Sequence, residues 1–238
     1  MTKTTVSLLA AAFVVATVPA FAADLPLGVV AAPAPAAAPL NTLTLETDPE
    51  FIETPNAPTD GSLQDWYIRG IYSRNLGQGL SGSLAIQNTA KPAGGAFAGG
   101  SDQQYYEGAL AYRLAVTSDL SFTVTGTLGY TAGNTGYLND AAVSGSTQGT
   151  EGFLYYAING AADWKVDQHW TWNVINARYR NAFDLTWVTP KVQTGLTYNI
   201  DAFNAVYGAV GYAWKDSGNG QGLQSSSYNV AVGYKYSF

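Results

Sequence analysis

The last twelve residues, SYNVAVGYKYSF (Ser227–Phe238), decide how the chain folds. Bulky apolar side chains occupy every second position, and small or polar side chains occupy the positions between them. The apolar set is Tyr228, Val230, Val232, Tyr234, Tyr236 and Phe238. A period of two places successive side chains on opposite faces of a β-strand, so the sequence predicts an amphipathic strand that ends at Phe238.

Seven upstream segments repeat this alternation of apolar and polar positions. They are residues 66–72, 106–116, 121–131, 154–166, 170–180, 191–200 and 204–215. Three connections between them are short turns, at 117–119, 167–168 and 201–202, whereas others, including 75–102 and 133–150, are far longer than usual. The sequence therefore predicts an all-β fold of eight antiparallel strands, with short turns at one end and long loops at the other.

Composition separates a membrane barrel from a soluble one. A secreted sandwich or lipocalin-like barrel would also alternate, but its exterior would here be mostly Ser, Thr, Asn and Gly, because only 12% of the residues are charged. Aromatic residues gather near the expected strand ends, where a lipid–water interface favours them. They are Trp66, Tyr130, Trp164, Trp170, Trp172, Trp214, Tyr228 and Tyr236. We therefore expect a transmembrane β-barrel with its apolar face toward lipid and its polar face lining the lumen.

The segment 170–180 breaks the simple alternation. Trp170 and Val174 share one face, but continuing their phase would turn Arg178 and Arg180 toward lipid. An arginine near the bilayer midplane costs about 2 to 4 kcal/mol. A bulge near Val174 would shift the phase and keep both arginines inside the barrel.

The N-terminal region differs in composition from the rest of the chain. Residues 1–22 have the pattern of a cleaved signal peptide, with an early lysine, an apolar stretch and Ala-Phe-Ala at the end. From Ala23 to Asp65 there are seven acidic residues, seven prolines and no Lys or Arg. Such a composition cannot bury enough apolar surface to fold alone. We therefore expect a disordered, Pro-rich acidic periplasmic arm at 23–61, followed by the outer-membrane barrel at 62–238.

Charged residues on the expected lumen face form the candidate site. They are Arg69, Glu107, Arg113, Asp163, Lys165, Arg178, Lys191 and Lys235. An eight-stranded barrel is just wide enough for side chains to fill, and buried charges must pair, so we expect a salt-bridged polar network rather than an open channel. Bases outnumber acids in the periplasmic half of this lumen. The acidic arm, with Glu46, Asp48, Glu50 and Glu53, either docks at that opening or remains a solvated linker.

No residue pattern indicates catalysis, a cofactor or a metal. The single histidine, His169, lies at a short turn without an obvious nucleophile, so we expect a turn or interface role. Loop acids at 139–140 and 216–219 lack the spacing of a calcium loop, and no Gly-rich segment joins a strand to a helix. There is no cysteine for a thiolate metal site, and a net charge of −6 argues against binding nucleic acid. We therefore predict a non-enzymatic protein without a cofactor.

The signal peptide, the eight alternating strands, the short turns at one end and the terminal Tyr234–Phe238 resemble small outer-membrane barrels of the OmpA and OmpX type. Asp65–Gly70 and Ala23–Pro26 also resemble segments of alphaproteobacterial surface barrels. The resemblance implies a bacterial outer-membrane location, contact with outer-membrane lipids, and insertion by the barrel assembly machinery through an assembly signal. The residues of that signal would be Tyr234, Tyr236 and Phe238.

For function, we expect a structural or surface-interaction role, with the outer loops contacting surface ligands. The alternatives are a narrow porin-like channel for small solutes and a barrel-embedded enzyme that modifies lipids.

Overall fold

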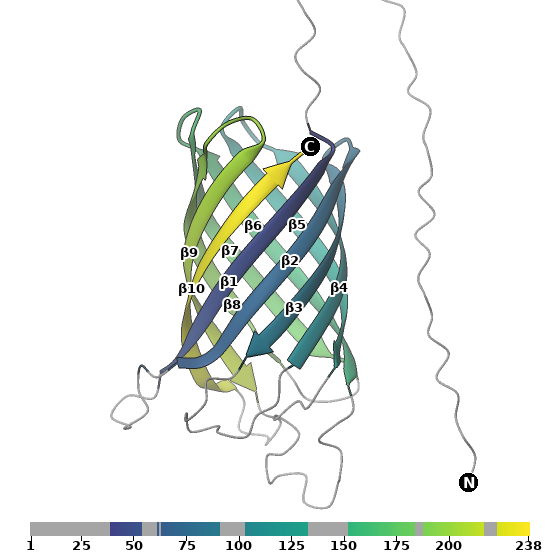
Figure 1. Ribbon diagram of the computed structural model, residues 1–238, viewed down its shortest axis with the longest axis vertical. Helices are drawn as coiled ribbons and strands as arrows, with labels where there is room; N and C mark the ends of the chain where they lie inside the picture. Colours follow the sequence, from purple (N-terminus) through teal and green to yellow (C-terminus); the bar gives the residue numbers. More distant parts are fainter. Residues whose placement is uncertain are drawn as a thin grey trace, which may run out of the picture. The chain divides into compact units, whose positions relative to one another are not determined.

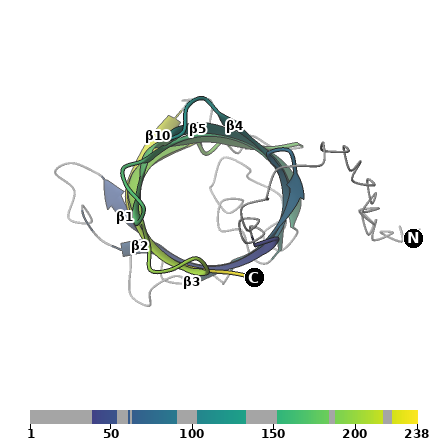
Figure 2. The ribbon, with the colours of Figure 1, turned by 90° about the horizontal axis from the view of Figure 1, so that it is seen from above.

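The chain forms a closed barrel of antiparallel strands. The computed structural model describes residues 39–53, 61, 63–90, 103–132, 152–183, 188–216 and 223–238. Within these residues the strands are β1 (Asn41–Glu53), β2 (Leu63–Gly77), β3 (Leu80–Ala90), β4 (Gln103–Ala115), β5 (Leu120–Ala132), β6 (Phe153–Lys165), β7 (Trp170–Ala182), β8 (Lys191–Asn199), β9 (Asn204–Asp216) and β10 (Leu223–Ser237). Each pairs with its sequence neighbours, and β1 pairs with β10 to close the cylinder (Figure 1, Figure 2). No helix among the described residues is long and apolar enough to cross a membrane.

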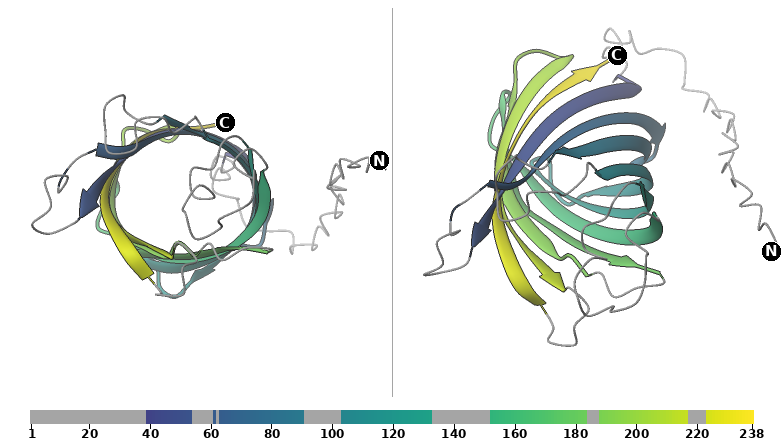
Figure 3. Two further views of the ribbon diagram at one scale, coloured as in Figure 1. Left: turned by 90° about the horizontal axis from the view of Figure 1, so that it is seen from below. Right: turned by 60° about the horizontal axis from the view of Figure 1, so that its bottom comes forward.

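The two ends of the barrel differ. One end, which we call the turn end, carries Asn41, Phe238 and the short connections β2–β3, β4–β5, β6–β7 and β8–β9. The opposite end, where β1 ends and β2 begins, is the loop end (Figure 3). The alternation of short and long connections predicted from the sequence is therefore present.

Polar side chains fix the turns at the turn end. The Asp201 carboxylate accepts hydrogen bonds from the backbone N–H groups of Phe203 at 2.7 Å and Asn204 at 2.8 Å. Asp167 makes the equivalent pair of bonds in the turn before β7. Hydrogen bonds to the ionised form favour it, so the pKa of Asp201 lies below its usual value, with the bond from Phe203 as the largest cause.

Apolar side chains cover the outside of the cylinder and small polar ones line the inside. In β5, Val124 and Leu128 are 60% and 65% exposed on the outer surface. Thr123, Thr125 and Thr127 alternate with them and face the lumen. This is the reverse of a soluble barrel, in which the apolar face points inward.

The strand count is ten among the described residues, not the eight expected, because two strands lie in segments assigned to an arm and a loop. β1 lies inside the expected disordered arm, so the barrel begins at Asn41 and the boundary at residue 62 is wrong. Leu43 and Leu45 point outward, whereas Glu46 and Asp48 point inward. Three of the acids that suggested a solvated arm, Glu46, Asp48 and Glu50, occupy the lumen face of this strand, whereas Glu53 accepts from the outward Tyr212. Residues 1–38, with the expected signal peptide, lie outside the described residues.

Pro49 hides β1 from sequence analysis. Proline has no N–H to donate to a β-ladder, and the pairing of β1 with β10 is interrupted between Thr47 and Glu50. At this point the Asn229 side chain of β10 donates to the Asp48 carboxylate at 2.7 Å. A side-chain bond thus joins the two strands where a backbone bond is missing.

β3 is the second additional strand, and it lies in the segment 75–102 that was expected to be a loop. A tight turn precedes it, with φ angles of 92°, 52° and 80° at Gly77, Gln78 and Gly79. A side chain at Gly79 would also overlap the carbonyl oxygen of Arg113, so this position requires glycine. The glycines that suggested a long loop form a hairpin turn instead.

The bulge expected near Val174 is present. Two adjacent residues of β6 pair with Asn173 and Ile175 of β7, so Val174 is the extra residue. Arg178 and Arg180 consequently lie on the lumen face. The free-energy cost of exposing two arginines to lipid therefore correctly predicted the β-bulge in β7.

Candidate functional site in the barrel lumen

Two rows of tyrosine, glycine and glutamate cross the inner wall. In the first row, Tyr155 of β6, Gly129 of β5 and Glu107 of β4 are register neighbours. The Tyr155 ring lies over Gly129, and its hydroxyl donates to Glu107 Oε1 at 2.7 Å. A Cβ at Gly129 would overlap this ring. The glycine therefore lets the tyrosine reach across a strand to the carboxylate.

The second row has the same construction on the other side of the barrel. Tyr207 of β9 lies over Gly233 of β10 and donates to Glu46 of β1. Arg69 of β2 stands between the two rows, because it is a register neighbour of Glu46 and forms an ion pair with Glu107. Arg69 thus pairs with one glutamate and lies beside the other, and a tyrosine bonds to each of them.

A buried ion pair extends this network to β8. Lys191 Nζ donates to Asp48 Oδ2 at 2.7 Å and lies 3.8 Å from Glu50 Oε1. Removing one partner of a buried pair is strongly destabilising, so the acids of β1 neutralise a base that would otherwise be isolated. We call these three adjacent groups of bonded side chains the polar belt. They are Tyr155, Glu107, Arg69, Glu46, Tyr207, Asp48 and Lys191.

Aromatic and basic side chains pack on the loop-end side of the polar belt. Arg180 Cζ lies 5.5 Å from the Tyr105 ring centroid and 5.4 Å from that of Tyr155. Its Nε donates to Thr189 Oγ1 at 2.9 Å. The two tyrosine rings meet edge to face, with centroids 6.2 Å apart. We call this group the loop-end cluster; it consists of Tyr105, Phe153, Tyr155, Arg180 and Ala182.

Burial divides the lumen into two halves. Inward side chains near the loop end are buried on every strand from β1 to β10. One from each strand, in order, is Glu50, Asp65, Thr89, Tyr105, Thr131, Tyr155, Ala182, Lys191, Ala213 and Ser227. Near the turn end, inward residues such as Thr44, Ser73 and Thr197 are only partly buried. The lumen is therefore filled toward the loop end and open toward the turn end.

The open half contains two adjoining cavities of about 650 and 420 Å³. Both are lined by Thr44, Ser73, Ser81, Thr197 and Lys235. The larger one lies at the turn end, and the smaller one reaches the polar belt at Glu46, Arg69 and Glu107. The described residues of the loop-end cluster line neither cavity. We call the two cavities together the vestibule.

The structure brings some of the predicted lumen charges together and separates others. Arg69 pairs with Glu107, both of which were predicted, whereas Lys191 pairs with Asp48 and Glu50 of the segment expected to be an arm. Neither docking of an arm at the opening nor a solvated linker describes residues 41–53. Asp48 and Glu50 neutralise lumen charge from within the wall.

The remaining predicted charges lie apart from these pairs. Asp163 accepts from Asn173, Arg113 Nε donates to Ser121 at 3.0 Å, and Lys235 Nζ lies 4.8 Å from the centroid of the Tyr207 ring. Lys165 has the lumen phase but is exposed at the turn end. Arg178 lines the smaller cavity and makes no hydrogen bond or ion pair with any described residue.

Sequence analysis missed the tyrosines of the polar belt. Tyr155 and Tyr207 lie at inward positions, each opposite an inward glycine on the adjacent strand. A tyrosine beside such a glycine is a usable signal, but it appears only when the register between strands is known. In the second row the glutamate was hidden as well, because Glu46 lies on β1, which was not recognised as a strand.

His169 and the end of β10 lie where the sequence placed them. His169 is in the β6–β7 turn, with Nδ1 2.9 Å from the carbonyl oxygen of Asn199. Tyr234, Tyr236 and Phe238 all point outward, and the last two rings stack with centroids 5.7 Å apart. An outward aromatic stripe at the closing strand is thus available for contact with lipid or another protein.

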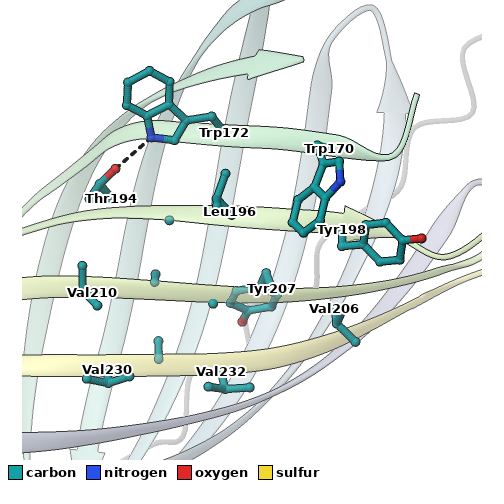
Figure 4. A pocket seen from close by; sticks show the side chains of 14 residues that line it. Trp170, Trp172, Thr194, Leu196, Tyr198, Val206, Tyr207, Val210, Val230 and Val232 are labelled. Carbon is teal, nitrogen blue, oxygen red and sulfur yellow. Dashed lines mark hydrogen bonds between the residues drawn. The ribbon is translucent and has the colours of Figure 1, made fainter. Parts of the chain in front are cut away.

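A hollow of about 780 Å³ lies on the outer surface (Figure 4). It arises because Gly208 has no side chain between Leu196 and Val232, its outward register neighbours. At its edge Trp172 Nε1 donates to Thr194 Oγ1 at 3.1 Å. The lining is almost entirely apolar, so this hollow suits hydrocarbon and not a polar solute.

Several solved outer-membrane proteins show a similar arrangement of strands. The NanC porin is 12% identical, with 82% of this chain and 100% of that chain covered and a TM-score of 0.44. The protease OmpT of Escherichia coli is 9% identical, with 84% and 97% covered and a TM-score of 0.44. Ail, the attachment invasion locus protein of Yersinia pestis, is 8% identical, with 84% and 99% covered and a TM-score of 0.38. Comparisons with protein-family models and with curated protein sequences gave no match. The function therefore has to be sought in the residues of this barrel.

Proposed function

We propose that this chain spans the outer membrane of a Gram-negative bacterium, with the turn end in the periplasm, and has a structural or surface-interaction role. In this proposal the lumen does not conduct solutes. Barrel assembly machinery would insert the chain through the outward aromatic residues of β10, and the connections at the loop end would meet partners at the cell surface.

Burial of inward side chains at the loop end is the observation that carries this proposal. These side chains are buried on all ten described strands, and the polar belt and loop-end cluster connect strands that are not neighbours. A lumen filled by mutually bonded side chains has no continuous water path at that depth. The apolar exterior, by contrast, is matched to hydrocarbon, because the described strands form a closed cylinder without a free sheet edge.

Fractionation and labelling test the location and orientation. The protein should be recovered with the outer membrane and should migrate faster on a denaturing gel before boiling than after it. Cysteines introduced at Gly94 and Ser146, in connections between strands at the loop end, should react with an impermeant reagent on intact cells, and one at Asp119 should not. Recovery as a soluble periplasmic protein, or the reverse labelling pattern, would contradict the proposal.

Conductance of the purified full chain in planar bilayers tests the closed lumen. We expect no steady single-channel openings from the wild-type protein. Replacing Arg180 and Tyr105 with alanine removes two side chains of the loop-end cluster and should produce openings. Replacing the outward-facing Leu128 with alanine is the matched control and should leave the bilayer silent.

A narrow solute channel is the second candidate, and the vestibule is the observation that favours it. Its cavities of about 650 and 420 Å³ already extend from the turn end to the polar belt. Only the loop-end half would then have to open. Steady openings of the wild-type protein would establish this candidate in place of the closed barrel.

A further inference from the structure

Arg178 differs from the inward bases of the polar belt and the loop-end cluster. Arg69 and Lys191 form ion pairs, and Arg180 packs between two tyrosine rings. Arg178 has no such partner among the described residues, and its Nε is buried without a hydrogen bond. A guanidinium carries five N–H donors in a fixed planar arrangement, so this side chain presents unused donors to the cavity that it lines.

Amide side chains surround Arg178 on the same wall. Asn159 of β6 is its register neighbour on one side, and the Oδ1 atom of Asn159 is buried without a donor. Asn176 and Gln193 form the next pair toward the turn end. All four residues line the cavity of about 420 Å³. An unused donor group and an unused acceptor thus lie side by side, in a space open to the turn end.

We propose that the smaller cavity of the vestibule is a binding site for a small hydroxylated monocarboxylate. The carboxylate accepts hydrogen bonds from the Arg178 guanidinium, whose planar shape matches it. A neighbouring hydroxyl of the ligand donates to Asn159 Oδ1, and the amides of Asn176 and Gln193 bind further hydroxyls. The site does not depend on conduction, because a ligand enters it from the turn end.

The surrounding charges favour a single negative charge on the ligand. Glu107 and Glu50 lie within electrostatic range of Arg178, as do Arg69 and Arg180. With Arg178 itself these groups are three bases and two acids, a net charge of +1 that one negative charge on the ligand neutralises, whereas a dianion such as phosphate would leave an excess negative charge. A neutral polyol would satisfy the amides but leave the guanidinium without a partner. The ligand class that satisfies both groups is therefore a carboxylate that also carries hydroxyls.

Binding of D-gluconate to the purified full chain in detergent micelles tests the site, by calorimetry or ligand-detected NMR. Sorbitol has the same hydroxyl chain without the carboxylate, and acetate has the carboxylate without hydroxyls. We expect saturable binding of gluconate, weaker binding of acetate and no binding of sorbitol. Arg178→Gln should weaken gluconate binding about tenfold to a hundredfold, the loss expected for hydrogen bonds to a charged group.

Two control variants separate a specific site from a general charge effect. Arg113→Gln removes the same charge from the turn end of the lumen, outside the smaller cavity, and should leave gluconate affinity unchanged. Asn159→Ala should weaken binding of gluconate but not of acetate. Folding of each variant is checked by its gel mobility before boiling.

Four results would overturn the proposal. They are no gluconate binding to the folded wild-type protein, equal binding of gluconate and sorbitol, unchanged affinity in a folded Arg178→Gln variant, and phosphate binding as tight as that of gluconate. Conductance measurements do not enter this test, so the site and the closed lumen can fail independently.

Discussion

Deletion of Val174 should destabilise the barrel by turning Arg178 and Arg180 toward lipid. Val174 is the extra residue of the β7 bulge, and without it the strand beyond residue 174 reverses its faces. Residue 176 is the middle of β7. With a rise of about 3.3 Å per residue and a tilt of about 40°, Arg178 lies about 5 Å and Arg180 about 10 Å from the midplane. Since the cost falls from about 2 to 4 kcal/mol at the midplane to about 0 to 1 near the interface, we expect a total of about 3 kcal/mol.

Urea unfolding in lipid vesicles, followed by gel mobility, measures this loss. Val174→Ala keeps the residue count and should cost far less than the deletion. Replacing Arg178 and Arg180 with leucine should restore stability when Val174 is deleted, because the leucines would then face lipid. The same two leucines should destabilise the full-length protein, where these positions face the lumen. Leucines that destabilise both backgrounds would refute the role of the bulge.

The other predictions concern the polar belt, a glycine row and a turn. Lys191→Met should cost about 3 to 5 kcal/mol in urea unfolding, because Asp48 stays buried without its partner, and adding Asp48→Asn should recover part of it. Gly129→Ala should cost about 1 to 3 kcal/mol by displacing the tyrosine over it, whereas Gly126→Ala, with open space around it, should be neutral. Because the pKa of Asp201 is lowered in the folded protein, its ionised carboxylate stabilises the fold above the unfolded pKa of about 3.9. This stabilisation is lost as the pH falls through the folded pKa. The stability difference between wild type and Asp201→Asn should therefore shrink as the pH falls below about 4; a constant difference would contradict this.

Strands with two clearly different faces could be predicted from the sequence, and those with charged or glycine-rich faces could not. β10 and β5 alternate large apolar with small polar residues, which only a half-apolar surface explains. β1 carries Leu43 and Leu45 on its outer face and three acids further along its inner face, and acidic residues beside a proline ordinarily indicate a solvated segment. An inner and an outer face can be recognised in β1, but burial of its acids is understandable only once Lys191, on the distant strand β8, is known to pair with Asp48.

The candidate site was predictable in kind but not in its connections. Burial cost alone identified inward bases such as Arg69 and Arg178. Which of them pairs with an acid depends on register across several strands, which a single sequence does not specify. Arg178 was expected within a network, and its lack of a partner could be found only from the three-dimensional arrangement.

The closure between β1 and β10 constrains how the chain reaches its native state. The backbones of Asn41 and Phe238 exchange two hydrogen bonds of 2.9 Å each across nearly the whole length of the barrel sequence. Every other strand pair forms between sequence neighbours, so these contacts are local and the closing contact is the most distant one in the chain. Until the last strand is made, the growing sheet has two unpaired edges, each able to join another chain and aggregate. Pairing of β1 with β10 therefore removes both exposed edges in a single step.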